Sequence, residues 1–357
     1  MPPIGVVLVN TVRDDRSNGA RRRTTALECV ANRPIICHAL EALTAASVEE
    51  VAVAVPAAVA DEVQSCIEAE RPRDIEVSYV TYDDARGASK AMRSTAERVG
   101  DAPCIVHFAD GLLAQPLAPF AAPLNDDSAD LLLLLHYDVS PADRLPDATR
   151  RLLRIAEFEP TQSSLGMAGV CLFGPGALLR ACDGAHVDLA AGEIDLVTVA
   201  GGIARAGGRM EVQLVRGWHR YVGQVEDLLE LNRATLDALT PEPPHPGCIS
   251  ANKISGRVAI DPTAYVRSSV ILGPVIIGPR ARVADAYIGP YTSIGPDARV
   301  DGAEIERSII SSGASIMHVG QRLAGSVVGP GARIFRDFSL PRAIRLCVGD
   351  NSEVALP

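Results

Sequence analysis

The stretch from Val275 to Val300 reads VIIGPRARVADAYIGPYTSIGPDARV, and its spacing of aliphatic residues decides the fold of the last third of the chain. An aliphatic residue recurs every six positions, and Gly-Pro pairs follow several of them. A hexapeptide repeat is typical of a parallel β-helix, in which each short strand stacks on the next coil. The pattern extends from residue 258 to residue 334 and slips to five between runs, with aliphatic positions Ile260, Val266, Leu272, Ile277, Val283, Ile288, Ile294, Val300, Ile310, Ile316, Val328 and Ile334.

An amphipathic α-helix does not explain this segment. It would need apolar spacings of three and four, and the Gly-Pro pairs would break it. Because each aliphatic side chain is buried only against the neighbouring coils, we expect a rigid element with flat outer faces that pack against another domain or subunit. Some hexapeptide proteins use a histidine as a catalytic base, but His318 has no evident partner residue, so we interpret it as a surface histidine.

Length and composition favour a folded protein with two domains. The chain has 357 residues, 47% of them hydrophobic, and a formal net charge of -10, which argues against nucleic acid as a partner. No apolar run reaches the roughly eighteen residues of a membrane span, and the N-terminus lacks the pattern of a secretory signal. The eight cysteines form no CxxC pair. The sequence therefore predicts a cytoplasmic protein without a membrane segment.

The first two thirds of the chain alternate between strand and helix patterns. This alternation predicts an α/β, Rossmann-like doubly wound parallel sheet, with ligands bound beyond the carboxyl ends of its strands. The resemblance given below implies a doubly wound sheet of mixed strand direction. The expected strands are 5–9, 51–55, 75–80, 104–108, 131–135, 168–173 and 212–215, and the expected helices are 34–45, 58–70, 88–99, 175–181, 195–205 and 225–239. The loops that begin at Asn10, Tyr82 and Ala109 should face the cleft.

A proline-rich segment separates the two patterns. Residues 240–247 read TPEPPHPG, and four prolines in eight residues exclude a regular element. The predicted organisation is an α/β domain over residues 1–239, a linker over 240–250 and a β-helix domain over 251–357.

Three blocks give the chain a family resemblance: residues 31–36 (ANRPII), residues 217–237 (GWHRYVGQVEDLLELNRATLD), and the β-helix with its ending RLCVGDNSEV. With them the chain resembles the sugar-1-phosphate nucleotidyltransferases, in particular the long-form glucose-1-phosphate thymidylyltransferases with a C-terminal left-handed β-helix. The resemblance implies attack of a sugar 1-phosphate on a nucleoside triphosphate, assisted by Mg²⁺. That reaction depends on positioning phosphates and neutralising their charge.

The phosphate-binding loop of the family is replaced in this chain. The family's loop reads LAGGxGTRL, and it aligns without a gap on the segment that begins at residue 8. Its three glycines fall on Asn10, Thr11 and Arg13, its arginine on Asp15 and its catalytic lysine on Thr25. Side chains would fill the space that phosphates need, and Asp15 would repel them.

The remaining site positions are partly kept. Tyr82 replaces the base-reading glutamine, and Gly87 matches the glycine that lies against the base. Asp110 matches one metal-binding aspartate and is the residual metal ligand, whereas Tyr221 replaces its partner. Mg²⁺ is therefore expected only if nucleotidyl transfer is retained. The ligand-binding candidates are Asn10, Arg13, Tyr82, Gly87, Gly169, Glu193 and Asp195.

These losses leave three functional hypotheses. Loss of one preorganised donor or cation typically costs about 2.7 to 4 kcal/mol of transition-state stabilisation. Because several such groups are missing here, the first hypothesis is a non-catalytic or regulatory homologue in a sugar or secondary-metabolite pathway. Its ligand would be a small molecule of nucleotide, sugar or cyclitol type. Its β-helix would mediate a homo-oligomer or association with an active paralogue.

The other two hypotheses keep catalysis. A repurposed enzyme would act on a nucleotide-sugar, sugar or cyclitol-like ligand, with His107, Asp110, His219 and Tyr221 as candidate catalytic residues, since a histidine with a carboxylate suffices for acid/base chemistry. The alternative for His107 is a core histidine, because it lies inside an apolar strand. A divergent active thymidylyltransferase would use loop arginines such as Arg13 in place of the lost cations.

Overall fold

The computed structural model divides the chain into two compact units. It describes residues 2–10, 12–13, 22–72, 74–83, 87–121, 129–137, 165–184, 201–204, 206–240 and 249–338. One unit comprises Met1–Thr11, Thr24–Glu28 and Pro34–Val222, and the other comprises Val12–Arg23, Cys29–Arg33 and Gly223–Pro357. No helix in the described part of the chain combines the length and apolarity that crossing a membrane requires.

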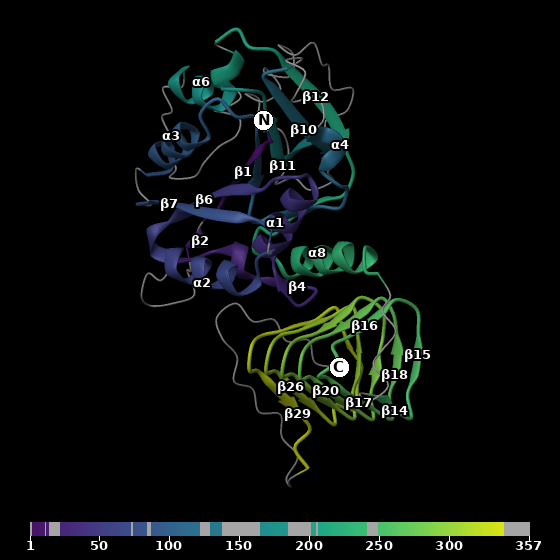
Figure 1. Cartoon of the computed structure of the whole chain (residues 1–357). Coiled ribbons are helices and arrows are strands. Elements are labelled where there is room, and N and C mark those ends of the chain that lie inside the picture. Colours follow the sequence, from purple (N-terminus) through teal and green to yellow (C-terminus); the bar gives the residue numbers. More distant parts are fainter. Residues whose placement is uncertain are drawn as a thin grey trace. The chain divides into compact units, whose positions relative to one another are not determined.

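The first unit is built on a seven-stranded mixed sheet (Figure 1). Its order is β12 (Met210–Val215), β10 (Leu131–Tyr137), β11 (Leu165–Phe173), β8 (Cys104–Phe108), β1 (Ile4–Leu8), β6 (Glu50–Pro56) and β7 (Glu76–Tyr82). Strand β11 runs antiparallel to both neighbours, whereas the other pairs are parallel. The predicted doubly wound mixed sheet is confirmed.

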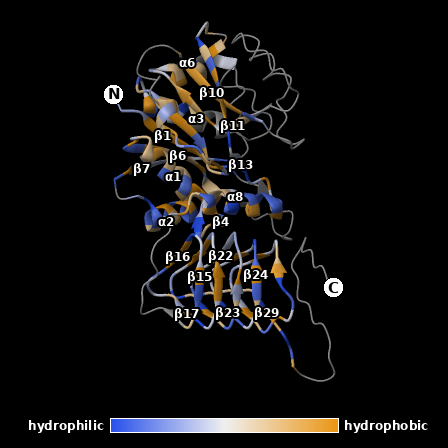
Figure 2. Cartoon of the chain, turned by 90° about the vertical axis from the view of Figure 1, so that its right-hand side faces the viewer, coloured by the Kyte–Doolittle hydropathy of each residue, from blue (hydrophilic) through white to orange (hydrophobic). Residues whose placement is uncertain are grey.

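Helices cover both faces of this sheet, as doubly wound folds require. Helices α1 (Ile35–Ala45) and α2 (Ala60–Glu70) bury their apolar residues on one face, and α3 (Gly87–Val99) and α6 (Ala177–Gly184) on the other. Along β1 the side chains alternate between the two cores, because successive residues of a strand point to opposite faces. In Figure 2 the hydrophobic colour follows β1, β6 and β10, which are buried on both sides.

Shorter elements occur in both units, and those within residues 12–23 belong to the second unit. The expected helix over residues 195–205 is described only at 201–204, which are helical. The short elements are β2 (Val12–Arg13), β3 (Arg22–Arg23), η1 (Thr25–Leu27), η2 (Ala57–Val59), β9 (Gly111–Leu113), α4 (Ala118–Ala121) and β13 (Trp218–Arg220).

The second unit contains the β-helix, made of three parallel sheets (Figure 1). The first sheet has β14 (Ile249–Ser250), β17 (Tyr265–Arg267), β20 (Arg282–Ala284), β23 (Arg299–Asp301), β26 (Ser315–Met317) and β29 (Arg333–Phe335). The second has β15 (Lys253–Ser255), β18 (Val270–Leu272), β21 (Tyr287–Ile288), β24 (Glu304–Glu306) and β27 (Leu323–Ala324). The third has β16 (Val258–Ile260), β19 (Val275–Ile277), β22 (Thr292–Ile294), β25 (Ile309–Ile310) and β28 (Val327–Val328). The stacked sheets are those of the predicted left-handed parallel β-helix.

One inward position of the β-helix differs from the prediction. Ile271 is fully buried in the coil interior, whereas Leu272 is half-buried on strand β18. At this place in the coil the chain advances by five residues rather than six, as it does in the next coil from Val283 to Ile288. Counting six residues from Val266 therefore gives Leu272 instead of Ile271. Because adjacent residues of a strand point to opposite sides, Leu272 does not point into the coil interior.

Helix α8 (Val225–Asp237) belongs to the same unit as the β-helix. Its Asn232 is 1% exposed and makes three hydrogen bonds. The Asn232 Oδ1 accepts from Ala31 N at 2.9 Å and from Ser293 Oγ at 2.6 Å, and Nδ2 donates to Tyr291 O at 3.1 Å. The side chain therefore links a helix, a coil of the β-helix and an N-terminal turn.

That turn joins strands β4 (Cys29–Val30) and β5 (Arg33–Pro34). Its two residues, Ala31 and Asn32, have positive φ angles of 46° and 66°, which suit a two-residue hairpin turn. The Asn32 Nδ2 donates to Ile294 O at 2.8 Å. The ANRPII block thus has a structural role at the β-helix.

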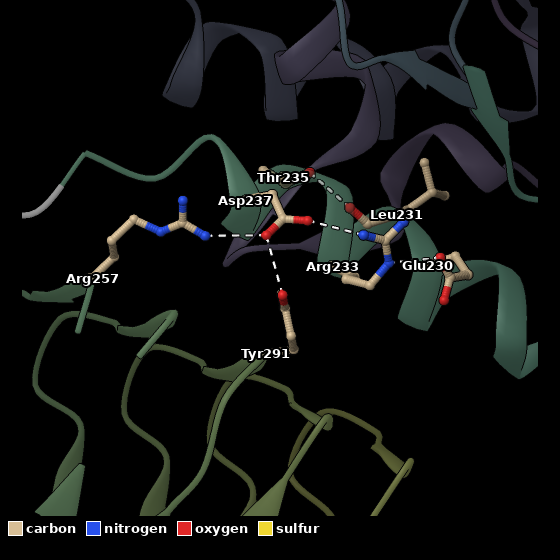
Figure 3. Close-up of polar contacts among 7 residues, drawn as sticks. All are labelled: Glu230, Leu231, Arg233, Thr235, Asp237, Arg257 and Tyr291. Atoms are coloured by element: carbon tan, nitrogen blue, oxygen red, sulfur yellow. Dashed lines mark hydrogen bonds and ion pairs between the residues drawn. The ribbon is translucent and has the colours of Figure 1, made fainter. Parts of the chain in front are cut away.

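The end of α8 carries a group of charged contacts (Figure 3). The carboxylate of Asp237 accepts from Arg233 Nη1 at 2.9 Å, from Arg257 Nη2 at 3.1 Å and from the Tyr291 hydroxyl at 3.3 Å. Pro241–Cys248, most of the predicted linker, lie outside the described residues, and the domain boundary near residue 239 stays a prediction.

Candidate functional site

The candidate site lies at the carboxyl ends of β1 and β8. The chain leaves β1 toward β6 and β7 on one side and later returns through β8 on the other, so this is where the strand order reverses. Open α/β sheets bind ligands at such a point. The turn after β8 is held against β1 by the Ala109 N–H, which donates to Leu8 O at 2.9 Å. Asp110 is the next residue, so it lies at the edge of the sheet where such folds bind ligands.

A two-stranded ribbon of β9 and β13 positions the residues around Asp110. Arg220 lies opposite Gly111 in this ribbon, and His219 lies opposite Leu112. The Tyr221 N–H donates to Asp110 O at 2.8 Å. The backbone therefore brings Asp110, His219 and Tyr221, three of the four predicted catalytic residues, to one place. Both His219 and Tyr221 are half-buried.

The carboxylate of Asp110 forms an ion pair with Arg220. The Arg220 Nε and Nη2 atoms both donate to Asp110 Oδ2, at 2.9 Å and 2.8 Å. The Asp110 side chain is 7% exposed and that of Arg220 is 38% exposed. The other carboxylate oxygen, Oδ1, is buried and has no hydrogen-bond partner in the described part of the chain. The sequence prediction missed Arg220, although it is the one cation between Gly217 and Tyr221.

The residues around Asp110 do not fit a divalent cation. Mg²⁺ is usually bound by one or two carboxylates together with waters and substrate phosphates, and the one carboxylate expected here already forms an ion pair with Arg220. A divalent cation at this carboxylate would also be repelled by the positive charge of the guanidinium bonded to it. Arg220 already neutralises the carboxylate, and Tyr221 stands where the resemblance predicts the second one.

His107, the fourth predicted catalytic residue, is buried in the core. Its side chain is 0% exposed, and its ring packs edge-on against Trp218 at a centroid distance of 5.8 Å. The Nδ1 atom lies 2.7 Å from Phe108 O, and because a carbonyl can only accept, Nδ1 carries the proton. Burial lowers the pKa of His107 to about 4, although the bond to Phe108 opposes this shift. At neutral pH His107 is an uncharged imidazole.

Two glycines next to the site are required by Trp218. A Cβ added to Gly111 would lie 2.5 Å from a ring carbon of Trp218, and a Cβ on Gly169 would overlap the same ring. The indole is almost completely buried in the core of the first unit. Gly169, predicted as a ligand-binding residue, therefore has a packing role, and a ligand-binding role for it stays a prediction.

Side-chain hydrogen bonds also hold the chain just after β1. The Tyr82 hydroxyl donates to Val9 O at 2.9 Å, and the Tyr82 side chain is buried. The Thr24 Oγ1 donates to Asn10 O at 2.8 Å and accepts from Ala26 N at 3.2 Å. The carbonyls of the first two residues after β1 are thus both engaged by side chains.

The remaining predicted ligand residues are placed only in part. Arg13 lies on β2, paired with Arg22, and its side chain is outside the described residues. Gly87 is the first residue of α3. Glu193 and Asp195 lie outside the described residues. In the second unit, His318 is exposed, as expected of a surface histidine, and packs edge-on against Phe338 at 6.0 Å.

Comparisons with known proteins agree with this architecture. No protein-family model matches the sequence. A glucose-1-phosphate thymidylyltransferase from Streptomyces griseus is 28% identical over 332 residues, covering 92% of each chain. A second, from Streptomyces antibioticus, is 27% identical over 338 residues, covering 92% of this chain and 93% of the relative. The low-salt glycan biosynthesis nucleotidyltransferase of Haloferax volcanii is 26% identical over 338 residues, covering 92% of each.

A solved structure shares the fold of about two thirds of the chain. It is a Bacillus anthracis protein described as a glucose-1-phosphate thymidylyltransferase, crystallised in complex with a sucrose. The two structures align with a TM-score of 0.50 and 15% sequence identity, over 64% of this chain and 94% of that one. At this identity the match supports the fold alone.

Proposed function

Because the chain belongs to the sugar-1-phosphate nucleotidyltransferase family, we propose that it is a member that has lost metal-assisted nucleotidyl transfer. Its cleft would bind a small molecule, and the protein would act as a non-catalytic, regulatory homologue. The β-helix would serve as the surface for self-association or for binding an active paralogue.

The ion pair between Asp110 and Arg220 carries this proposal. In nucleotidyl transfer a divalent cation bridges the phosphates and neutralises charge as the bond to the leaving group breaks. Here a guanidinium lies 2.8 Å from the carboxylate that would hold that cation. An ion pair between two side chains of the same protein has no net charge, so it attracts a metal far less than two free carboxylates would.

The replaced phosphate loop supports the same conclusion. Asn10 and Arg13 stand where the family has glycines, and Thr25 stands where it has the catalytic lysine. Thr25 is buried, so its hydroxyl does not replace an extended cation in the cleft. With each lost donor or cation typically reducing the rate by about 10² to 10³, the combined losses remove most of the expected acceleration, even allowing for non-additivity.

Two other functions are the alternatives to this proposal. The names of the two Streptomyces relatives favour a retained thymidylyltransferase reaction, which would have to proceed through loop arginines in place of the lysine. A repurposed acid/base enzyme would use Asp110, His219 and Tyr221, which the β9–β13 ribbon brings together.

The test is a pyrophosphate-release assay. The purified protein is incubated with Mg²⁺, each of the common nucleoside triphosphates and a panel of sugar 1-phosphates, with the Streptomyces griseus relative as the positive control. We expect no release above the protein-free background. Turnover of this chain at ordinary enzymatic rates, about 1 s⁻¹ or faster, would overturn the proposal.

A further inference from the structure

The first sheet of the β-helix presents an exposed outer face. Its strands β17, β20, β23, β26 and β29 lie side by side (Figure 1). The middle residue of each strand, such as Val283, points into the coil, so the residues on either side of it point outward. We call these outward side chains the arginine face. One row of it is Tyr265, Arg282, Arg299, Ser315 and Arg333, and the other is Arg267, Ala284, Asp301, Met317 and Phe335.

The first row brings like charges together. Arg282 pairs in register with Arg299 on the next coil, so their Cα atoms are about 4.8 Å apart. Arg333 lies two coils beyond Arg299, with Ser315 between them. Positive charges this close repel each other. The row therefore costs stability in the isolated protein.

Other arginines of the β-helix are neutralised by acids of neighbouring coils. Arg280 pairs with Asp297 at 2.6 Å, and Arg322 pairs with Glu304 at 3.0 Å. On the arginine face, Arg267 pairs with Asp285 and Arg299 with Asp301, both at 3.2 Å. In the part of the chain that the structure describes, no acid forms an ion pair with Arg282 or Arg333, and both are exposed.

The second row adds apolar surface beside the charges. Phe335 is 51% exposed, and the Arg333 guanidinium lies over its ring at 5.3 Å from the centroid. Met317 is the neighbour of Phe335 on the preceding coil. Tyr265, at the other end of the face, is 49% exposed. Aromatic residues, methionine and arginine are the residue types enriched in protein interfaces, so this composition is typical of a protein-binding surface.

We propose that the arginine face binds an acidic, extended segment of a partner protein. This inference rests on the proposed role of the β-helix in association and names the partner's chemistry. Three strand separations place Arg282 and Arg333 about 14 Å apart. In an extended peptide, residues i and i+4 are also about 14 Å apart and point to the same side. Acidic residues at alternate positions therefore match the length of the arginine row.

Two other occupants fit this face less well. The strand positions carry four arginines and one aspartate, so two copies of the face brought together would repel each other. An anionic lipid surface would attract the arginines but would also meet the carboxylates of Asp285 and Asp301. A polypeptide can place carboxylates on the arginines and apolar side chains on Met317 and Phe335.

The test measures binding of fluorescently labelled poly-L-glutamate to the full-length protein by fluorescence anisotropy, at an ionic strength of about 0.01 M, where screening is weak. The double variant Arg282→Gln, Arg333→Gln is compared with the matched control Arg98→Gln, Arg307→Gln, which removes two exposed arginines outside the face. We expect the dissociation constant to rise about fivefold or more in the first variant and to stay within about twofold of wild type in the control. The melting temperature of the first variant should not fall, because a repulsion is removed.

Three results would overturn the inference. They are no binding of poly-L-glutamate to wild type, equal weakening in the two double variants, and tighter binding of wild type to phosphatidylserine vesicles or to inorganic polyphosphate than to poly-L-glutamate. None of these measurements depends on catalysis. Pyrophosphate release would refute the proposed loss of nucleotidyl transfer and leave the arginine face intact, whereas absence of poly-L-glutamate binding would refute only the arginine face.

Discussion

Protonation of His107 should make the stability of the first unit depend on pH. Burial holds the pKa of this fully buried imidazole at about 4, whereas an unfolded histidine titrates near 6.5. Between these values the unfolded chain binds more protons than the folded one, so stability is present at pH 7 and is lost as the pH falls. The full shift corresponds to about 3.4 kcal/mol, of which about 2 kcal/mol is lost between pH 7 and pH 5.

Urea denaturation followed by tryptophan fluorescence measures this effect directly. Trp218 is the single tryptophan of the chain, and its ring lies 5.8 Å from that of His107. The free energy of unfolding of wild type should fall by about 2 kcal/mol more than that of His107→Phe between pH 7 and pH 5. His318→Gln, in the other unit, is the matched control and should retain the wild-type pH dependence.

Equal pH dependence in wild type and His107→Phe would refute this reasoning. It would mean that the imidazole is solvated or paired in the folded protein, and His107 would regain its place among the candidate bases. A lowered pKa near 4 instead makes His107 a poor general base at neutral pH, because an efficient base titrates close to the working pH.

Four further substitutions test the packing. Asn232→Ala should destabilise the second unit by about 3 kcal/mol, because three buried hydrogen bonds are lost. A calorimetric melting curve measures this loss, and an unchanged melting temperature would contradict the described contacts. Ile271→Ala should lower the free energy of unfolding, measured by urea denaturation, by about 2 to 5 kcal/mol, and Leu272→Ala should lower it by under about 1.5 kcal/mol. Equal losses would show that Leu272 is the inward residue. Gly169→Ala should displace the indole of Trp218 and shift its fluorescence to longer wavelength, and an unshifted spectrum would show that the predicted overlap is absent.

The sequence predicts the elements better than the contacts between them. The six-residue spacing identifies the β-helix because its interior admits one aliphatic side chain for each side of a coil. It misplaces Leu272 because a five-residue side cannot be distinguished from a six-residue side where two aliphatic residues are adjacent. Alternating strands and helices likewise give the doubly wound sheet, but not the antiparallel direction of β11.

In the candidate site, too, the sequence predicts residues but not the contacts between them. Asp110 and Tyr221 could be chosen from the sequence because they align with positions of known type. The pairing of Arg220 with Asp110 depends on the register of the β9–β13 ribbon, which brings residues 110 positions apart into contact. The bond from Tyr82 to Val9 depends in the same way on strand order. No periodicity along the chain encodes either contact.

Metal binding tests the central claim most directly, because Arg220 is proposed to take the place of a divalent cation at Asp110. Mn²⁺, an electron paramagnetic resonance probe for Mg²⁺ sites, is titrated into the wild-type protein and into the double variant Arg220→Ala, Tyr221→Asp. The account predicts no tightly bound Mn²⁺ in wild type and the appearance of one site in the variant. One Mn²⁺ bound to wild type with micromolar affinity, and lost in Asp110→Asn, would contradict it.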